Sequence, residues 1–345
     1  EQILELKLCD PAMGSGAFLV ECCRQLADEV VAAWGREKQV EEIATFCPEG
    51  DVVAHARRLV AQRCLYGVDK NVMAVQLAKL SLWLFTLARE LPFTFLDHSL
   101  RYGDSLVGLD FQQIKAFHWQ PKKQLSFLEE EISKALDEVV AIRQEIHELA
   151  GDSTPEGQKI KAQRLFDAND ATDKVRKIAD VCVGAFFDKD KDKLRLDERQ
   201  YREGIVRDWL SGDEKAEINV DHLVENIRYQ HAPFHWWIEF PEVFYKYRSD
   251  PLDNGVKGAA YMDGFIGNPP FLGGLGISGS YGNGYRDWLY QVAEGAKHRC
   301  DLSAYFLRRA SDLLGGVGTL GFVSTNTISQ GATREGGLKY LLSSD

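Results

Sequence analysis

The chain has 345 residues, of which 45% are apolar and 27% are charged. These proportions are those of an ordinary globular protein, and they exclude a collagen-like, disordered or low-complexity chain. Lysine and arginine number 41 against 52 aspartates and glutamates, so the formal net charge is −11. A protein that held nucleic acid mainly by its bulk charge would be basic, so any such contact must use a local groove or a region outside this chain.

The cysteines and the longest apolar stretch indicate the cellular environment of the chain. Its seven cysteines form no C-x-x-C pair, and several lie in apolar periodic runs, as reduced core thiols of a cytosolic protein do. The stretch from Leu77 to Phe95 is interrupted by charged residues and a proline, so we expect no membrane span.

The first elements in chain order alternate between strands and helices. The run Ile3 to Cys9 predicts a strand, the turn Asp10 to Gly16 follows it, and apolar residues at helical spacing come next. A second strand is predicted over Cys64 to Val68. It ends at Asp69, and a helix is predicted over Val72 to Leu87.

A third strand is expected near Ser99 to Tyr102, and Asp104 follows it closely. Each of the first three predicted strands thus ends near an aspartate. Repeated βα units predict a parallel sheet with crossover helices, so these aspartates should share one edge of the sheet.

The alternation stops after the third strand. Apolar residues three and four apart predict a helical hairpin from Ser126 to about Ala185, with solvated charged faces. The sheet pattern resumes only after the aromatic stretch Pro233 to Phe244. We therefore expect a mainly helical insertion over 111–230, between a cofactor-binding half over 1–110 and a catalytic half over 231–345.

Met262 to Gly267 is predicted to be a buried fourth strand, and Asn268-Pro269-Pro270-Phe271 follows it. Two prolines remove backbone donors and fix the direction of the chain, which a sheet tolerates at its carboxyl edge. Open α/β sheets bind ligands at that edge. The amide of Asn268 and a free proline carbonyl can accept hydrogen bonds from a planar amino group, and Phe271 offers a ring for stacking. This turn therefore predicts a site for an aromatic amine.

The rest of the chain predicts a loop, a helix and a strand. Gly273 to Gly284 is expected to be a glycine-rich loop beside the target pocket, Leu302 to Leu314 an amphipathic helix, and Thr319 to Ser324 a fifth strand. Three residues of the loop and the chain just after it are available to meet a nucleic-acid strand: Tyr281, Tyr285 and Arg286.

Other site types fit the pattern less well. A dinucleotide-binding turn would need glycine where Leu19 stands, and the glycine-rich loop lacks the Gly-Lys-Ser/Thr of a phosphate loop. His231 and His235 have a spacing seen in zinc sites, but Pro233 lies between them and no carboxylate motif follows, so we expect no metal.

Two motifs, in this order along the chain, resemble the amino-group DNA methyltransferases, most closely the N6-adenine type. They are Asp10-Pro11-x-x-Gly14-Ser15-Gly16-x-Phe18-Leu19 and Ile266-Gly267-Asn268-Pro269-Pro270-Phe271. The stretches 234–244 and 324–336 resemble single-chain methyltransferases of restriction-modification or phage-defence systems that carry a helical insertion. The resemblance covers most of 3–110 and 230–340 and leaves the helical hairpin unaccounted for.

The resemblance implies a class I, Rossmann-like α/β fold and S-adenosylmethionine as the methyl donor. It implies that Asp69 accepts hydrogen bonds from the cofactor's ribose hydroxyls and Asp104 from its adenine amino group. The complete set of cofactor-binding residues that it implies lies at the ends of the first three strands: Asp10, Pro11, Gly14, Gly16, Asp69 and Asp104.

The same resemblance implies the reaction and the partner. Asn268 and Pro269 would hold the N6 amino group of an adenine extruded from DNA, and Phe271 would stack on that base. The implied partner is DNA. The resemblance implies neither membrane association nor a metal ion, and it implies a location in the cytoplasm of a prokaryote.

Other substrates and a non-catalytic role remain open at this point. Enzymes that methylate cytosine N4, an RNA guanine or a protein glutamine have a similar turn, and the chain could also be a cofactor-binding module of a larger DNA-recognition protein. The family's fold has more strands than are predicted up to Ser324. We therefore expect a fragment without the last strands or a target-recognition domain, poorly active alone.

Overall fold

The computed structural model describes residues 2–47, 50–87, 91–120, 128–149, 154–244, 261–293, 296 and 300–343. These residues form a parallel sheet in the order β3-β2-β1-β4-β5. From β1 the chain continues to β2 and β3 on one side of the sheet, and later to β4 and β5 on the other, so the strand order reverses at β1. The strands are β1 (Leu8–Asp10), β2 (Leu65–Asp69), β3 (Leu100–Tyr102), β4 (Met262–Gly267) and β5 (Leu314–Phe322).

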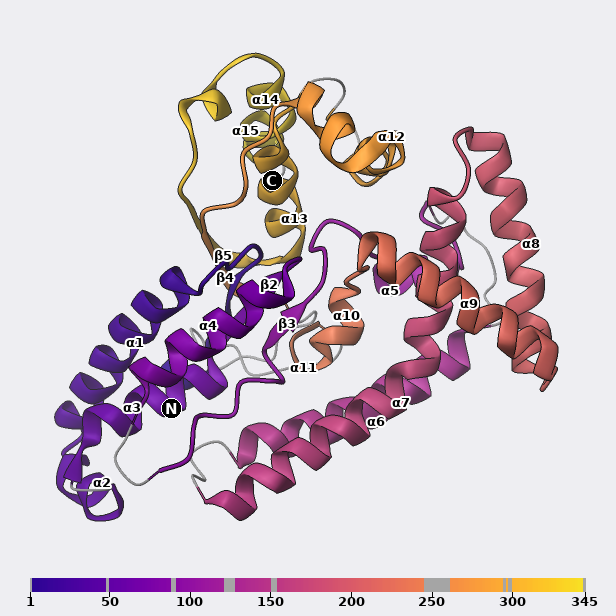
Figure 1. The fold of residues 1–345 in the computed structure, drawn as a ribbon. Helices are drawn as coiled ribbons and strands as arrows, with labels where there is room; N and C mark the ends of the chain where they lie inside the picture. The colour runs from indigo at the N-terminus through magenta and orange to yellow at the C-terminus, as the bar shows by residue number, and fades with distance from the viewer. Residues whose placement is uncertain are drawn as a thin grey trace.

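One face of the sheet is covered by helices from the N-terminal part of the chain (Figure 1). Leu65 of β2 points to this face and Tyr66 to the opposite one, as the two-residue period of a strand requires. The covering helix after β2 begins at Asn71, whose side chain accepts a hydrogen bond from the backbone of Met73 at 2.9 Å. The helices of this region are α1 (Ala17–Arg36), α2 (Val40–Phe46), α3 (Val52–Arg63) and α4 (Val72–Phe85).

The opposite face packs against aromatic side chains. Tyr66, Trp236, Phe240 and Phe265 are buried there together, and their rings meet edge to face. Trp236 begins the short helix α10 (Trp236–Glu239), and Phe240 lies between it and α11 (Pro241–Phe244). Helix α11 and helix α13 (Leu302–Leu313) add further apolar side chains. The predicted aromatic stretch is therefore core.

The predicted helical insertion is present and is longer than the expected hairpin. Figure 1 shows α6 and α7 side by side as a long antiparallel pair, with α8 and α9 at the far end of α7. The expected start of the hairpin, Ser126, lies outside the described residues. The helices are α5 (Phe111–Lys115), α6 (Glu129–Glu148), α7 (Pro155–Phe187), α8 (Asp192–Leu210) and α9 (Glu214–His231).

Buried ion pairs attach this insertion to the rest of the molecule. Arg143 of α6 donates to Glu242 of α11 at 2.7 Å, and their side chains are only 3% and 4% exposed. Arg176 of α7 pairs with Glu239 of α10 at 2.7 Å, and Arg101 of β3 pairs with the same carboxylate. Helices, sheet and aromatic layer are therefore joined by charge as well as by apolar contacts.

The expectation of a loop over Gly273 to Gly284 is wrong. The structure has helix α12 (Gly274–Val292), broken by non-helical backbone at Gly282, where φ is 85° and ψ is 165°. Its buried residues are apolar or aromatic and recur at helical spacing: Ile277, Tyr285, Trp288 and Leu289. Because this face packs into the core that α7 and α13 share, burial outweighs the low helix propensity of the glycines.

Two strand boundaries also differ from the expectation. Gln2–Glu5 is a 3₁₀ helix (η1), and β1 starts only at Leu8, where its pairing with Leu65 of β2 begins. Strand β5 begins at Leu314, directly after α13, because its pairing with β4 starts there. The chain then continues through η3 (Asn326–Ser329), α14 (Gly331–Gly336) and α15 (Leu338–Ser343).

All seven cysteines are free thiols, and most are buried. Across the described ranges, none of the helices has both the length and the apolar character needed to cross a membrane.

Candidate functional site

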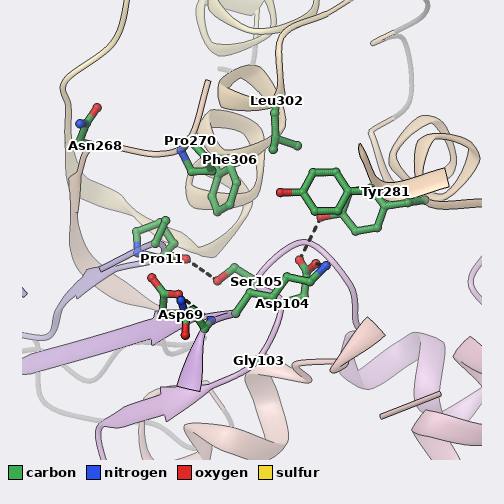
Figure 2. Close-up of a pocket in the computed structure, with 14 residues that line it drawn as sticks. Pro11, Asp69, Gly103, Asp104, Ser105, Asn268, Pro270, Tyr281, Leu302 and Phe306 are labelled. Carbon is green, nitrogen blue, oxygen red and sulfur yellow. Dashed lines mark hydrogen bonds and ion pairs between the residues drawn. The ribbon is translucent and has the colours of Figure 1, made fainter. Parts of the chain in front are cut away.

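A cavity of about 420 Å³ lies at the carboxyl ends of the strands, where their order reverses. This is the position at which open α/β sheets bind ligands, and the volume is typical of small-molecule sites. Figure 2 shows the side chains that surround it. They are Pro11, Ala12, Asp69, Lys70, Asn71, Gly103, Asp104, Ser105, Asn268, Pro270, Tyr281, Tyr285, Leu302 and Phe306.

The turn after β1 packs against β2 and α4. The backbone N–H of Gly14 donates to Oδ2 of Asp69 at 2.9 Å, which fixes the turn to the end of β2. Gly14 and Gly16 have φ values of 54° and 81°, in the left-handed region that favours glycine. At Gly16 a Cβ would also lie 3.0 Å from that of Ala78 in α4.

Asp10 lies beneath this turn and is 1% exposed. Its Oδ1 accepts a hydrogen bond from the backbone of Ala12 at 3.0 Å. Burial raises the pKa of the Asp10 carboxyl to about 7, and the negative charge of Asp69 adds to the shift. Gly267, at the end of β4, packs against this carboxyl: a Cβ there would lie 2.5 Å from Oδ1. Asp10 thus joins the turn after β1 to the turn after β4.

Asp69 lies on the cavity wall with both carboxylate oxygens engaged by backbone. Oδ2 accepts from Gly14, and Oδ1 accepts from the backbone of Asn71 at 2.7 Å. A carboxylate can accept about four hydrogen bonds, so each oxygen can still take one from a ligand.

Asp104 lies at the other end of the cavity and is 3% exposed. Its Oδ1 accepts from the backbone of Leu106 at 3.0 Å and from the hydroxyl of Tyr285 at 3.2 Å. Its Oδ2 accepts from Nζ of Lys70 at 2.8 Å. The neighbouring Ser105 donates to the carbonyl of Pro11 at 2.5 Å, which joins this loop to the first turn.

Residues 232–235, which follow the insertion, pack against the loop that contains Asp104. The backbone N–H of Asp104 donates to the carbonyl of Ala232 at 2.8 Å, and Phe234 donates to the carbonyl of Val107 at 2.7 Å. Gly108 lies so close to the carbonyl of Phe234 that no Cβ would fit. We call residues 104–109 together with residues 232–235 the loop clamp.

The turn after β4 contributes Asn268 and Pro270 to the cavity wall. Figure 2 shows Asn268 at one side, well apart from Asp69 and Asp104. Pro269 is buried beneath the turn, and Phe271 is 38% exposed. Of the site residues expected from the sequence, the structure therefore brings four to this cavity: Pro11, Asp69, Asp104 and Asn268. Five others are not on its wall: Asp10, Gly14, Gly16, Pro269 and Phe271.

The sequence interpretation missed several residues of the wall, among them Lys70 and Ser105, although each directly follows a predicted aspartate. The expectation that Tyr285 is available to a nucleic-acid strand is wrong, because Tyr285 is 3% exposed and contacts Asp104. The rings of Tyr281 and Tyr285 stack with centroids 4.9 Å apart across the break at Gly282, so regular helical spacing gave no signal for their meeting.

The two histidines with zinc-like spacing have other contacts. His231 stacks on Phe187, with ring centroids 3.8 Å apart, and burial, together with the charge of Lys70, lowers its pKa to about 4. His235 accepts from the backbone of Leu109 at Nδ1, so Nε2 carries the proton and donates to Asp180 at 3.0 Å. Within the described ranges, no group of three His, Cys, Asp or Glu side chains is placed to hold a metal ion.

The parallel sheet, the cavity at its switch point and the helical insertion are those of a class I methyltransferase fold, to which the family match assigns the chain. The sequence model of a family described as the Eco57I restriction-modification methylase matches residues 63–344, and the chain belongs to this family. The matched range includes Asp69, Asp104 and Asn268.

A curated relative is similar over a shorter range. It is a putative type II restriction enzyme and methyltransferase of Methanocaldococcus jannaschii, 26% identical over 125 residues. The alignment covers 33% of this chain and 10% of that relative, so the match spans about a tenth of the relative's length.

Proposed function

We propose that the chain catalyses methyl transfer from S-adenosylmethionine to the N6 amino group of adenine in DNA, in a restriction-modification setting. The observation that carries this proposal is that Asn268, Asp69 and Asp104 line one cavity at the switch point of the sheet. Membership of a restriction-modification methylase family supports DNA as the substrate.

The residues of the cavity fit the proposed cofactor. Two carboxylates on its wall, Asp69 and Asp104, supply acceptors for ribose hydroxyls and for an amino group. Leu302, Phe306 and Pro270 give apolar surface for an aromatic ring on the opposite side (Figure 2). When bound, S-adenosylmethionine supplies a sulfonium methyl that is already strongly electrophilic.

The remaining chemical task for the chain is to position and prepare the amine. The amide oxygen of Asn268 and the carbonyl of Pro269 accept the two amino hydrogens, which draws the nitrogen toward tetrahedral geometry and frees its lone pair. Aligning the reacting atoms in this way can lower a barrier by about 7–11 kcal/mol. The exposed ring of Phe271 stacks on the extruded base and offsets part of the few kcal/mol that extrusion costs.

Asn268→Ala tests the catalytic assignment. We expect methylation of DNA to be lost while the affinity for S-adenosylmethionine stays within about twofold, because Asp69 and Asp104 remain. Transfer of a labelled methyl group and calorimetric titration measure the two quantities. Asn226→Ala, at an exposed position of α9, is the matched control. Normal methylation by Asn268→Ala would exclude the proposed role.

The identity of the methylated base needs its own measurement. Digestion of the product to nucleosides, followed by mass spectrometry, should give N6-methyldeoxyadenosine. N4-methylcytosine, or methylation of RNA or protein instead, would replace the proposed substrate by one of the other amines that this turn suits.

Asp69→Ala tests the cofactor assignment. We expect the affinity for S-adenosylmethionine to fall at least tenfold, because the loss of a charged acceptor leaves the bound hydroxyls without partners. Equal binding by the variant and the wild type would remove Asp69 from the site.

We also propose that the three parts expected from the sequence have separate tasks. Residues 1–110 and 231–345 each supply part of the cavity wall. The helices of 111–230 support the loop clamp, because Asp180 of α7 accepts a hydrogen bond from His235. This division rests on the placement of Asp69, Asp104 and Asn268.

A further inference from the structure

We propose that Lys70 and Tyr285 are positioning residues for Asp104, and that they give the site its preference for a 6-amino over a 6-oxo purine. This inference rests on the proposed function, because it assigns Asp104 to the adenine ring of the cofactor. It adds two residues, from the end of β2 and from α12, that act through Asp104.

Lys70 supplies the positive charge beside this buried carboxylate. Its Nζ lies 2.8 Å from Oδ2 of Asp104, whose side chain is 3% exposed, while the Lys70 side chain is 38% exposed. The same Nζ lies 4.8 Å from the ring centroid of Tyr281 and 4.9 Å from that of Tyr285. These distances are in the range of cation–π contacts, so the two rings restrict where the ammonium can sit.

Tyr285 fixes the other oxygen. Its hydroxyl donates to Oδ1 of Asp104 at 3.2 Å, and the ring is buried against Tyr281, with centroids 4.9 Å apart. The backbone of Leu106 donates to the same oxygen. The carboxylate therefore cannot rotate without losing contacts to three residues: Lys70, Leu106 and Tyr285.

The contacts leave one acceptor position for a ligand. Oδ1 already accepts two hydrogen bonds and Oδ2 accepts one, and a carboxylate oxygen accepts about two. The remaining position on Oδ2 suits the N–H of a 6-amino group. A 6-oxo purine would place a carbonyl oxygen against this oxygen, and two acceptors repel each other in a water-poor site.

The partial exposure of Lys70 is compatible with this role. Its ammonium lies beside the tyrosine rings on the cavity wall, and the ligand approaches Oδ2 from the cavity side. A residue that merely blocked the site would have the opposite effect on affinity, because its removal would tighten binding. The two roles therefore predict changes of opposite sign.

The experiment compares S-adenosylhomocysteine with its 6-oxo analogue, S-inosylhomocysteine, by calorimetric titration. The wild type should prefer the amino compound at least tenfold. Lys70→Met, similar in length but uncharged, should reduce this preference about tenfold, and Lys70→Arg should restore part of it. Tyr285→Phe, which removes only the hydroxyl, should reduce the preference about threefold.

Tyr201→Phe is the matched control. It removes a hydroxyl from an exposed tyrosine of α8 that is not on the cavity wall. Its preference should equal that of the wild type. If the residues had a merely structural role, the affinities for both compounds would fall equally and their ratio would stay unchanged. Circular dichroism and thermal unfolding of each variant detect such a loss of structure.

Three results with the variants would overturn the inference. These are an unchanged ratio in Lys70→Met and Tyr285→Phe, tighter binding by either variant, or an equal change in Tyr201→Phe and Tyr285→Phe. A wild type that binds both compounds without preference would also end it while leaving cofactor binding intact. A wild type that binds neither would refute the proposed function, and the inference with it.

Discussion

Asp10 shows how one buried carboxyl connects two turns of the site. It is covered by the turn after β1, and Gly267 leaves it just enough room at the end of β4. Burial is the main reason why the pKa of this carboxyl rises to about 7, and the charge of Asp69 contributes. The folded protein therefore prefers Asp10 protonated at a pH where an exposed aspartate is ionised.

This shift predicts how the stability depends on pH. The folded pKa is raised above the usual 3.8, so the stabilising contribution of protonated Asp10 is complete below about pH 4 and is lost as the pH rises through about 7. Asp10→Asn removes this dependence. Urea unfolding at pH 5 and pH 8 should show that the variant gains stability relative to the wild type as the pH rises. A constant difference between the two proteins would contradict the shift.

Gly267 should tolerate no side chain. Its φ is 152° and a Cβ would press on Oδ1 of Asp10, so we expect Gly267→Ala to cost about 1–3 kcal/mol of stability. Gly273→Ala is the control, because open space surrounds that residue and its φ is −55°. Chemical denaturation of both variants provides the comparison. Equal stabilities would mean that the two turns are less tightly packed than described.

At the scale of elements, the helical insertion is attached by charge to the aromatic face of the molecule. Arg143 of α6 donates to Glu242 of α11, which also accepts from the hydroxyl of Tyr66 in β2 at 3.1 Å. Burial alone would raise the pKa of Glu242. The charge of Arg143 outweighs this effect and holds that pKa well below its usual range. Such a pair constrains the relative placement of the elements more than it adds net stability.

Glu242→Ala should weaken the attachment of α6 to α11. It leaves the guanidinium of Arg143 buried without its partner, so we expect a loss of about 3–5 kcal/mol in urea unfolding. Glu138→Ala, at an exposed position of the same α6 helix, should change the stability by less than about 0.5 kcal/mol. If both substitutions cost the same, the buried pair does not hold the insertion in place.

At the scale of the whole molecule, the buried His98 and the partly buried His147 predict sensitivity to acid. His98 and His147 have ring centroids 5.3 Å apart where the chain before β3 meets α6. Burial lowers the pKa of both, with their mutual charge adding for His98. Their contribution is present above about pH 6.5, the value in the unfolded chain, and is lost as the pH falls below it.

The double variant His98→Gln/His147→Gln should therefore lose less stability than the wild type between pH 7 and pH 5. His222→Gln, at an exposed position of α9, is the control. Thermal unfolding across this range gives the comparison, and parallel curves for wild type and double variant would argue against lowered pKa values for these two histidines.

The sequence was sufficient to predict the parallel sheet and the meeting of Asp69, Asp104 and Asn268 at one cavity, because parallel strands end at the same edge. It was not sufficient for α12, because what makes that glycine-rich segment helical is a core shared with α7 and α13, far away in the chain. For the same reason the contact between Tyr285 and Asp104 could not be predicted. The orientation of Phe271 depends on how the turn after β4 leaves the sheet, which local pattern does not determine.

The loop clamp has a consequence for anyone who wants to exchange parts between members of this family. Its two strips are more than a hundred residues apart in the chain, yet Gly108 fits Phe234 and the Asp104 backbone bonds to Ala232 as one unit. A chimera that imports foreign helices in place of α5 to α9 must keep both strips from a single parent. Splicing inside either strip would misplace Asp104 even if every grafted helix folded.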